Sequence, residues 1–123
     1  MSIFGNSKGH FLADISIFPC GPEANRRNEP AFNGIRWAFV YAEDFDQDPS
    51  NASQSDVWPE FLDASGLAVA SGVPLVGMYQ AKMHIIFDHM IHEHFKRLCI
   101  GTEFYCAEGL MKTAEGVVTK LSV

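Results

Sequence analysis

The sequence has no long apolar run, few cysteines and no basic residue over most of its middle. No apolar stretch reaches the about 20 residues that a membrane-spanning helix needs, so no membrane segment is predicted. The first ten residues lack the basic and then apolar layout of a secretory signal. Three cysteines, an odd number without a CxxC pair, argue against a disulfide framework. We therefore predict reduced, buried thiols in a cytoplasmic protein, at Cys20, Cys99 and Cys106.

Motifs for catalysis and nucleotide binding are missing as well. The stretch from Gly5 to Gly9 lacks the GxxxxGK[ST] spacing that cradles phosphates, so we expect neither nucleotide binding nor GTP hydrolysis. Cys106 lies in a strand pattern and Cys99 follows an apolar run, which favours structural thiols over a nucleophile. Carboxylates gather only in an acidic loop, where nothing would desolvate them for acid–base work. The sequence predicts no enzyme and no cofactor.

What the sequence does contain is one domain's worth of chain with an uneven charge distribution. Its 123 residues can form a single core, to which ten phenylalanines contribute, and the net charge is −6. Residues 37–81 contain no Lys or Arg but carry seven acidic residues. One interpretation is a solvated loop that maintains solubility. The other is an acidic face that attracts a basic protein partner and repels nucleic acid, formed by Glu43, Asp44, Asp46, Asp48 and Asp56.

Alternating apolar and polar residues predict a series of short strands after a flexible segment over residues 1–9. Residues 19–30 and 43–55 are expected to be loops, and residues 88–98 fit either a short helix or an extended loop. Many short strands with Gly and Pro turns favour a single all-β barrel or sandwich over residues 10–123. The predicted strands before residue 100 are His10–Phe18, Ile35–Tyr41, Val57–Leu62, Leu67–Ala70 and Gln80–Phe87.

The last twenty residues predict a hairpin that closes the fold. Phe104 and Cys106 alternate with polar neighbours in a first strand, and the run from Val117 to Leu121 forms a second. Glu108-Gly109 and Glu115-Gly116 lie between them, where glycine can turn or bulge the chain. We expect the final strand to pair with one from early in the chain.

Several segments, in the same order, resemble the third domain of translation elongation factor Tu. The segment from Arg27 to Arg36, RNEPAFNGIR, is similar to that domain's Arg-His-Thr-Pro-Phe-Phe-Asn-Gly-Tyr-Arg. FLADISI resembles its first strand, Pro74 to Met83 its Met-Pro-Gly-Asp-Asn-Ile-Lys-Met stretch, and the closing EGVVTKL its ending. The resemblance implies a closed, six-stranded antiparallel β-barrel. In the full factor this domain is not catalytic and contacts the GTPase domain, the T stem of tRNA and the exchange factor.

The resemblance also implies candidate RNA-binding residues. Lys82 corresponds to a lysine near the tRNA backbone, and Glu108 with Gly109 keeps the turn that approaches the T stem. The family's Gly-Arg after this turn is replaced by Leu110-Met111, which removes a phosphate contact and blocks a close backbone approach. Lys112 lies one position too late to compensate. These changes, and the family's Gln replaced by Ala38, weigh against retained tRNA binding.

The histidines supply the remaining candidates, since four lie close together with Asp88 and Glu93 between them. They could converge on a divalent metal, although their spacing matches no zinc signature. Solvated loop residues are the simpler interpretation, and titration between pH 5 and 8 could tune a partner contact. The four are His84, His89, His92 and His94.

The sequence therefore supports three hypotheses. The first is a non-enzymatic cytoplasmic binding module that acts by protein–protein contact, of the immunity or antitoxin-like inhibitor kind, on a basic partner. The second is a translation-associated tRNA-binding protein that uses the retained T-stem residues. The third is a metal-dependent regulator built on the histidines. The partner's identity and the oligomeric state stay open.

Overall fold

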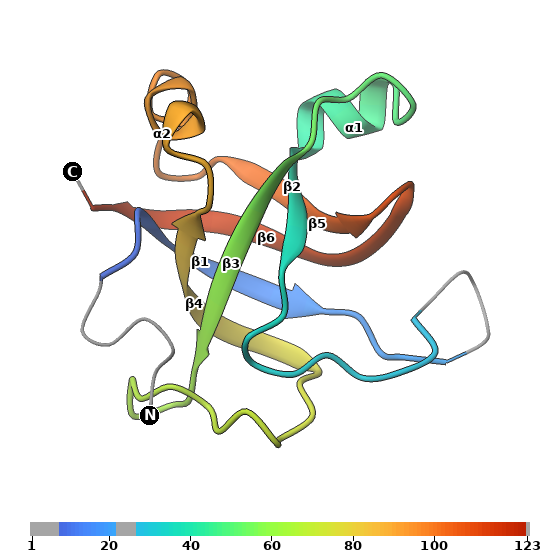
Figure 1. The fold of residues 1–123 in the computed structure, drawn as a ribbon, viewed down its shortest axis with the longest axis vertical. Helices are drawn as coiled ribbons and strands as arrows, with labels where there is room; N and C mark the ends of the chain where they lie inside the picture. The colour runs from blue at the N-terminus through green and yellow to red at the C-terminus, as the bar shows by residue number, and fades with distance from the viewer. Residues whose placement is uncertain (1–7, 22–26, 123) are drawn as a thin grey trace.

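The computed structural model describes residues 8–21 and 27–122, which form one closed β-barrel (Figure 1). The flexible segment expected over residues 1–9 lies mostly outside this range. The strands follow the order β1-β4-β3-β2-β5-β6 around the barrel, and every neighbouring pair is antiparallel. The elements are β1 (Phe11–Ile17), β2 (Trp37–Tyr41), α1 (Ala42–Gln47), β3 (Ser55–Leu62), β4 (Gly77–Ile85), α2 (Asp88–Phe95), β5 (Glu103–Glu108) and β6 (Met111–Leu121).

The barrel interior is filled by the apolar faces that the alternation predicts. In β1, Phe11, Ala13, Ile15 and Ile17 are all buried, and in β2 so are Trp37, Phe39 and Tyr41. Three phenylalanine rings meet at the centre, because successive strand residues point to opposite faces and one face of each strand turns inward. Phe39 stacks on Phe104 with ring centres 4.8 Å apart, and Phe11 meets both rings edge-on. The predicted six-stranded antiparallel barrel is confirmed.

The final hairpin closes this barrel, as predicted. β6 pairs with β5 on one side and with β1 on the other, which joins the end of the chain to its beginning. The connection expected up to Gly116 is shorter than predicted, because β6 already begins at Met111. Gly109 makes the turn with a φ of 63°. Gly116 lies within β6 instead, and its missing side chain leaves room for the Phe104 ring opposite.

Two short helices cover one end of the barrel (Figure 1). The loop predicted from residue 43 is wrong over α1. Phe45 buries its ring against Tyr105, and acidic residues in the first turn favour the helix N-terminus. Residues 88–95 form α2, which places the side chain of His94 in the interior.

The strand predicted over Leu67–Ala70 is also wrong. This segment makes one isolated bridge, between Leu62 and Ala68. Asp63 turns the chain just before it, since its carboxylate accepts the backbone N–H groups of Ser65 and Leu67. Among the described residues no helix is long and apolar enough to cross a membrane.

Candidate protein-binding groove

The outer face of three neighbouring strands, β5, β6 and β1, places acidic side chains from distant parts of the sequence together. Val117 of β6 lies opposite Asp14 of β1 on one side and opposite Glu103 of β5 on the other. All three side chains are exposed. Two carboxylates therefore flank one apolar side chain in a single row across the sheet.

The next row along these strands adds a third carboxylate and an aromatic ring. Glu115 lies opposite Ser16 and Tyr105. Asp46 reaches this row from α1, and its two carboxylate oxygens accept the Tyr105 hydroxyl at 2.8 and 3.0 Å. The ring of Phe45 packs against Tyr105 and holds α1 in place.

These residues line an open depression of about 490 Å³, which we call the acidic groove. Its carboxylates are Asp14, Asp46, Glu103 and Glu115. Its walls and floor also include the two exposed apolar side chains of Met78 and Val117, with Ser16, Ala42, Phe104, Tyr105 and Gly116.

The carboxylates of the acidic groove are not neutralised by ion pairs with described residues. Five ion pairs connect described residues, and none of them involves a carboxylate of the acidic groove. Lys112 is beside it, but its ammonium lies over the Tyr105 ring, 4.2 Å from the centre. Burial, the bond to Asp46 and the nearby carboxylates of Asp46, Glu115 and Glu103 raise the pKa of Tyr105 to about 12. The tyrosine therefore stays neutral and adds no charge.

Three of the five acidic residues predicted from the sequence, Asp44, Asp48 and Asp56, have polar partners within the protein. Asp44 accepts two hydrogen bonds from Arg97, at 2.8 and 2.9 Å, and this pairing lowers its pKa. Arg36 and Asp56 form an ion pair at 2.7 Å, and Asp48 accepts a hydrogen bond from the Asn51 amide. Glu43 lines a second depression, of about 420 Å³, that adjoins the acidic groove at Asp46 and Glu103.

Folding partly neutralises the stretch without Lys or Arg, residues 37–81. It brings Arg36 and Arg97, from just before and well after that stretch, against its carboxylates. Of the predicted residues, Asp46 belongs to the acidic groove. Sequence reasoning missed the other three carboxylates, which lie in separate strands, although Asp14 was already on the polar face of a predicted strand.

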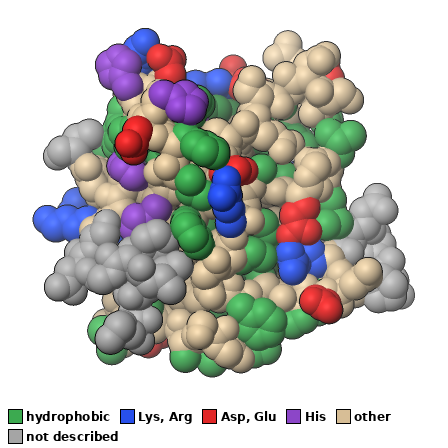
Figure 2. Space-filling view, viewed as in Figure 1, with side chains coloured by type: hydrophobic (Ala, Val, Ile, Leu, Met, Phe, Trp, Pro, Cys, Tyr) green, Lys and Arg blue, Asp and Glu red, His purple; other side chains and the backbone are tan. Residues whose placement is uncertain are grey.

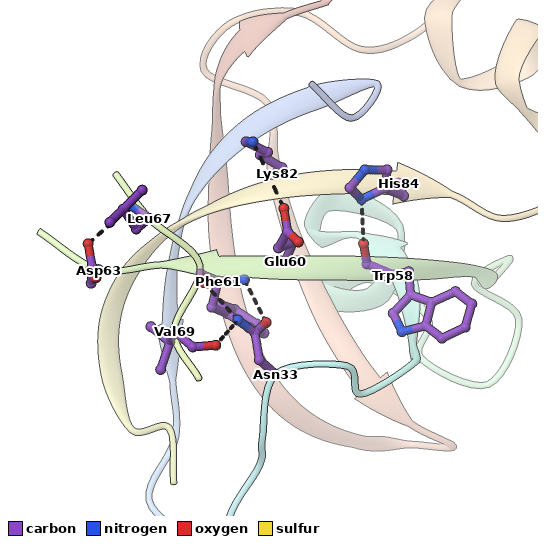
Figure 3. A network of polar contacts seen from close by, with 9 residues as sticks. All are labelled: Asn33, Trp58, Glu60, Phe61, Asp63, Leu67, Val69, Lys82 and His84. Carbon is purple, nitrogen blue, oxygen red and sulfur yellow. Dashed lines mark hydrogen bonds and ion pairs between the residues drawn. The ribbon is translucent and has the colours of Figure 1, made fainter. Parts of the chain in front are cut away.

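Three of the four candidate RNA-binding residues, Glu108, Gly109 and Lys112, lie together at the β5–β6 hairpin, whereas Lys82 lies elsewhere. Lys82 lies in β4, where its ammonium is 3.9 Å from the Glu60 carboxylate (Figure 3). Glu108 pairs with Arg27 and accepts the Trp37 indole N–H at 2.9 Å, and the Gly109 carbonyl accepts the Gln54 amide. In the sheet, Lys82 of β4 is paired with Leu12 of β1, and Leu12 is paired on its other side with Lys120 of β6. Lys120 lies at the opposite end of β6 from Lys112.

The histidine candidates are split between surface and interior. His89 and His92 are exposed on α2, whereas His84 and His94 are buried, and burial lowers the pKa of both buried imidazoles. His84 Nδ1 lies 3.2 Å from the Trp58 carbonyl (Figure 3). Purple histidine side chains gather on one side of the face in Figure 2, around and below α2. Even so, among the described residues no three His, Cys, Asp or Glu side chains form a group that could hold a metal ion.

His94 is the centre of a hydrogen-bonded trio of side chains. Its Nε2 lies 2.7 Å from Ser55 Oγ, and its Nδ1 lies 2.8 Å from the Tyr41 hydroxyl. Burial raises the pKa of Tyr41 to about 12, so this hydroxyl keeps its proton. Burial also lowers the pKa of His94, which favours the neutral imidazole. The trio joins α2 to β2 and β3.

The cysteines differ from the prediction in their burial. Cys106 is fully buried, and burial raises its pKa to about 12. Cys20 and Cys99 are exposed, because both lie in connections rather than in strands, so the prediction of three buried thiols is wrong for these two. All three are free thiols.

Comparisons with the models of known protein families and with curated proteins find no match to this chain.

Proposed function

We propose that this protein is a non-enzymatic binding module that holds a basic partner protein in the acidic groove. The observation that carries this proposal is the set of four carboxylates, Asp14, Asp46, Glu103 and Glu115, which line one depression without an ion pair to any described residue. Outside the acidic groove, five basic side chains lie within ion-pair distance of a carboxylate: Arg27, Arg36, Lys82, Lys96 and Arg97.

The composition of the acidic groove favours a protein partner over a nucleic acid. Carboxylates repel phosphate, and nucleic-acid sites normally combine aromatic platforms with basic neighbours. The acidic groove instead exposes Met78 by 67% and Val117 by 39%. Mixed apolar and charged surface is what a protein partner can cover while its basic side chains meet the carboxylates. By contrast, acidic and basic side chains lie side by side on the face seen in Figure 2.

The barrel fixes the backbone positions that carry these carboxylates before the partner arrives. Three of them come from paired strands, and the fourth is fixed by the Tyr105 hydroxyl. A preorganised surface loses little conformational freedom on binding, and its negative potential speeds encounter with a basic protein. A module of this kind would act as an inhibitor, of the immunity or antitoxin-like kind, when it covers the partner's own basic site.

The test compares two variants with equal charge. The groove variant carries Asp14→Asn, Glu103→Gln and Glu115→Gln. The control variant carries Asp48→Asn, Asp56→Asn and Glu93→Gln, which lie outside the acidic groove. Each protein is immobilised and exposed to lysate of its host, with and without RNase.

We expect wild type and control variant to retain the same basic protein, with or without RNase, and the groove variant to lose it. Equal retention by the groove variant would refute the acidic groove as the binding site. Recovery of tRNA, or of a partner lost on RNase treatment, would support the RNA-binding hypothesis instead.

A further inference from the structure

The partner's binding segment can be specified further, on the assumption that the proposed function is correct. We infer that it is amphipathic, with an apolar side chain that packs on Val117 and basic side chains on both sides that reach Asp14 and Glu103. A Lys- or Arg-rich protein segment with intervening apolar residues has this chemistry.

The order of side chains across the sheet supports this inference. Asp14, Val117 and Glu103 occupy one row on three successive strands. Neighbouring strands are about 4.8 Å apart, so the two carboxylate-bearing positions lie about 10 Å from each other with Val117 midway. This order, acidic then apolar then acidic, is complementary to a segment that presents basic, apolar and basic side chains in turn.

The neighbouring row defines which carboxylates are available to the segment. Asp46 already accepts the Tyr105 hydroxyl with both oxygens, so its capacity for a further partner is reduced. Glu115 carries no such bond among the described residues and lies next to Val117 on the same face of β6. The main acceptors for cations are therefore Asp14, Glu103 and Glu115, which surround the valine.

The exposed apolar side chains of the acidic groove favour a ligand that carries apolar groups over one that carries only positive charge. Met78 enters the acidic groove from β4 beside Ser16, and it is 67% exposed. A polyamine or an all-lysine segment would satisfy the carboxylates and leave Met78 and Val117 in contact with water. Only a segment with apolar side chains removes that surface from water, which strengthens binding.

Three probes separate these chemistries. Two are peptides of equal length and charge, one repeating Lys-Leu-Lys-Gly and the other Lys-Ser-Lys-Gly, and the third is spermine. Their dissociation constants are measured by calorimetry at low ionic strength for the wild type and for two matched variants. Val117→Ser alters the acidic groove, and Val73→Ser alters an exposed valine in the loop before β4.

We expect wild type to bind the leucine peptide about tenfold more tightly than the serine peptide, because part of a leucine side chain is buried. Val117→Ser should abolish this preference, and Val73→Ser should keep it. Equal binding of the two peptides by wild type, an unchanged preference in Val117→Ser, or tighter binding of spermine would each overturn the inference.

The groove variant distinguishes failure of the inference from failure of the proposed function. If neutralising the three carboxylates weakens both peptides while leucine gives no advantage, the acidic groove binds cations and only the amphipathic inference fails. If neutralisation leaves both peptides unaffected, the proposed function fails as well.

Discussion

Replacing Gly116 by alanine should destabilise the barrel, because Gly116 lies in β6 directly opposite Phe104. A Cβ atom built on Gly116 would lie 2.5 Å from Cζ of Phe104 and 2.9 Å from each Cε. The ring cannot turn away easily. It is 1% exposed, stacks on Phe39 at 4.8 Å and meets Phe11 edge-on at 6.1 Å. Gly116→Ala must therefore displace either an aromatic cluster or a strand.

The expected cost follows from two opposing effects. Inserting a methyl group into a close-packed core destabilises proteins by about 1–3 kcal/mol. Alanine also restricts the unfolded chain more than glycine does, which returns roughly 0.5 kcal/mol. We therefore expect Gly116→Ala to lower the free energy of unfolding by about 0.5–2.5 kcal/mol. At a urea slope of roughly 1.7 kcal/mol/M, this corresponds to a fall in the urea midpoint of about 0.3–1.5 M.

Urea unfolding followed by tryptophan fluorescence measures this change, since Trp37 is buried in the barrel. Gly72→Ala is the matched control. Its Cβ would meet no atom within 4 Å and its φ is not positive, so stability should stay the same or rise slightly. A Gly116→Ala protein as stable as the Gly72→Ala protein would show that the Phe104 ring is not packed against β6 as described.

Three further predictions follow from buried polar groups and thiols. Asn33→Ala should lower the free energy of unfolding in urea by about 2–3 kcal/mol. The Asn33 amide group donates to the carbonyls of Phe61 and Val69, and its oxygen accepts the Phe61 N–H (Figure 3). A change below roughly 0.5 kcal/mol would contradict this. A thiol reagent should modify two thiols in the folded protein and the third, Cys106, only after unfolding; rapid reaction of all three would contradict its burial. The free energy of unfolding should be constant just above pH 6.5 and should fall as the pH is lowered from there. Burial lowers three histidine pKa values from 6.5, so below that pH the unfolded chain binds protons more readily than the folded one. His94→Gln should flatten this dependence, and a urea midpoint that does not change between pH 7.5 and 5 would refute it. The three histidines are His10, His84 and His94.

The barrel could be predicted from the sequence because its signal is local. Phe11, Ala13, Ile15 and Ile17 alternate with less buried residues, and the structure turns that face inward. The hairpin that closes the fold could also be predicted, because the chain ends with the β-branched residues Val117, Val118 and Thr119.

Two elements were mispredicted, one because a tertiary contact decides it and the other because a local turn does. The acidic composition around α1 is typical of a loop, and its helix depends on Phe45 packing against Tyr105, which lies far along the chain. Leu67–Ala70 has an apolar composition suited to a strand. The turn at Asp63 comes just before it, and the segment then forms only one isolated β-bridge among the described residues, between Leu62 and Ala68.

The candidate site could not be predicted because it exists only across strands. Asp14, Glu103 and Glu115 come from three elements, and only the β1–β6–β5 pairing puts them on one face. Conversely, Asp44 looked available in the sequence until folding brought Arg97 to it. Charge along the chain and charge on the surface differ here because ion pairs join distant residues.

The measurement that tests the central claim most directly is a nuclear magnetic resonance titration of the isotope-labelled protein with the Lys-Leu-Lys-Gly peptide. Binding in the acidic groove predicts that the largest changes in amide shifts occur on β1, β6 and β5, at Asp14, Val117 and Glu103. Changes centred instead on residues 48–56, or around Lys82, would place the basic ligand elsewhere and contradict the account.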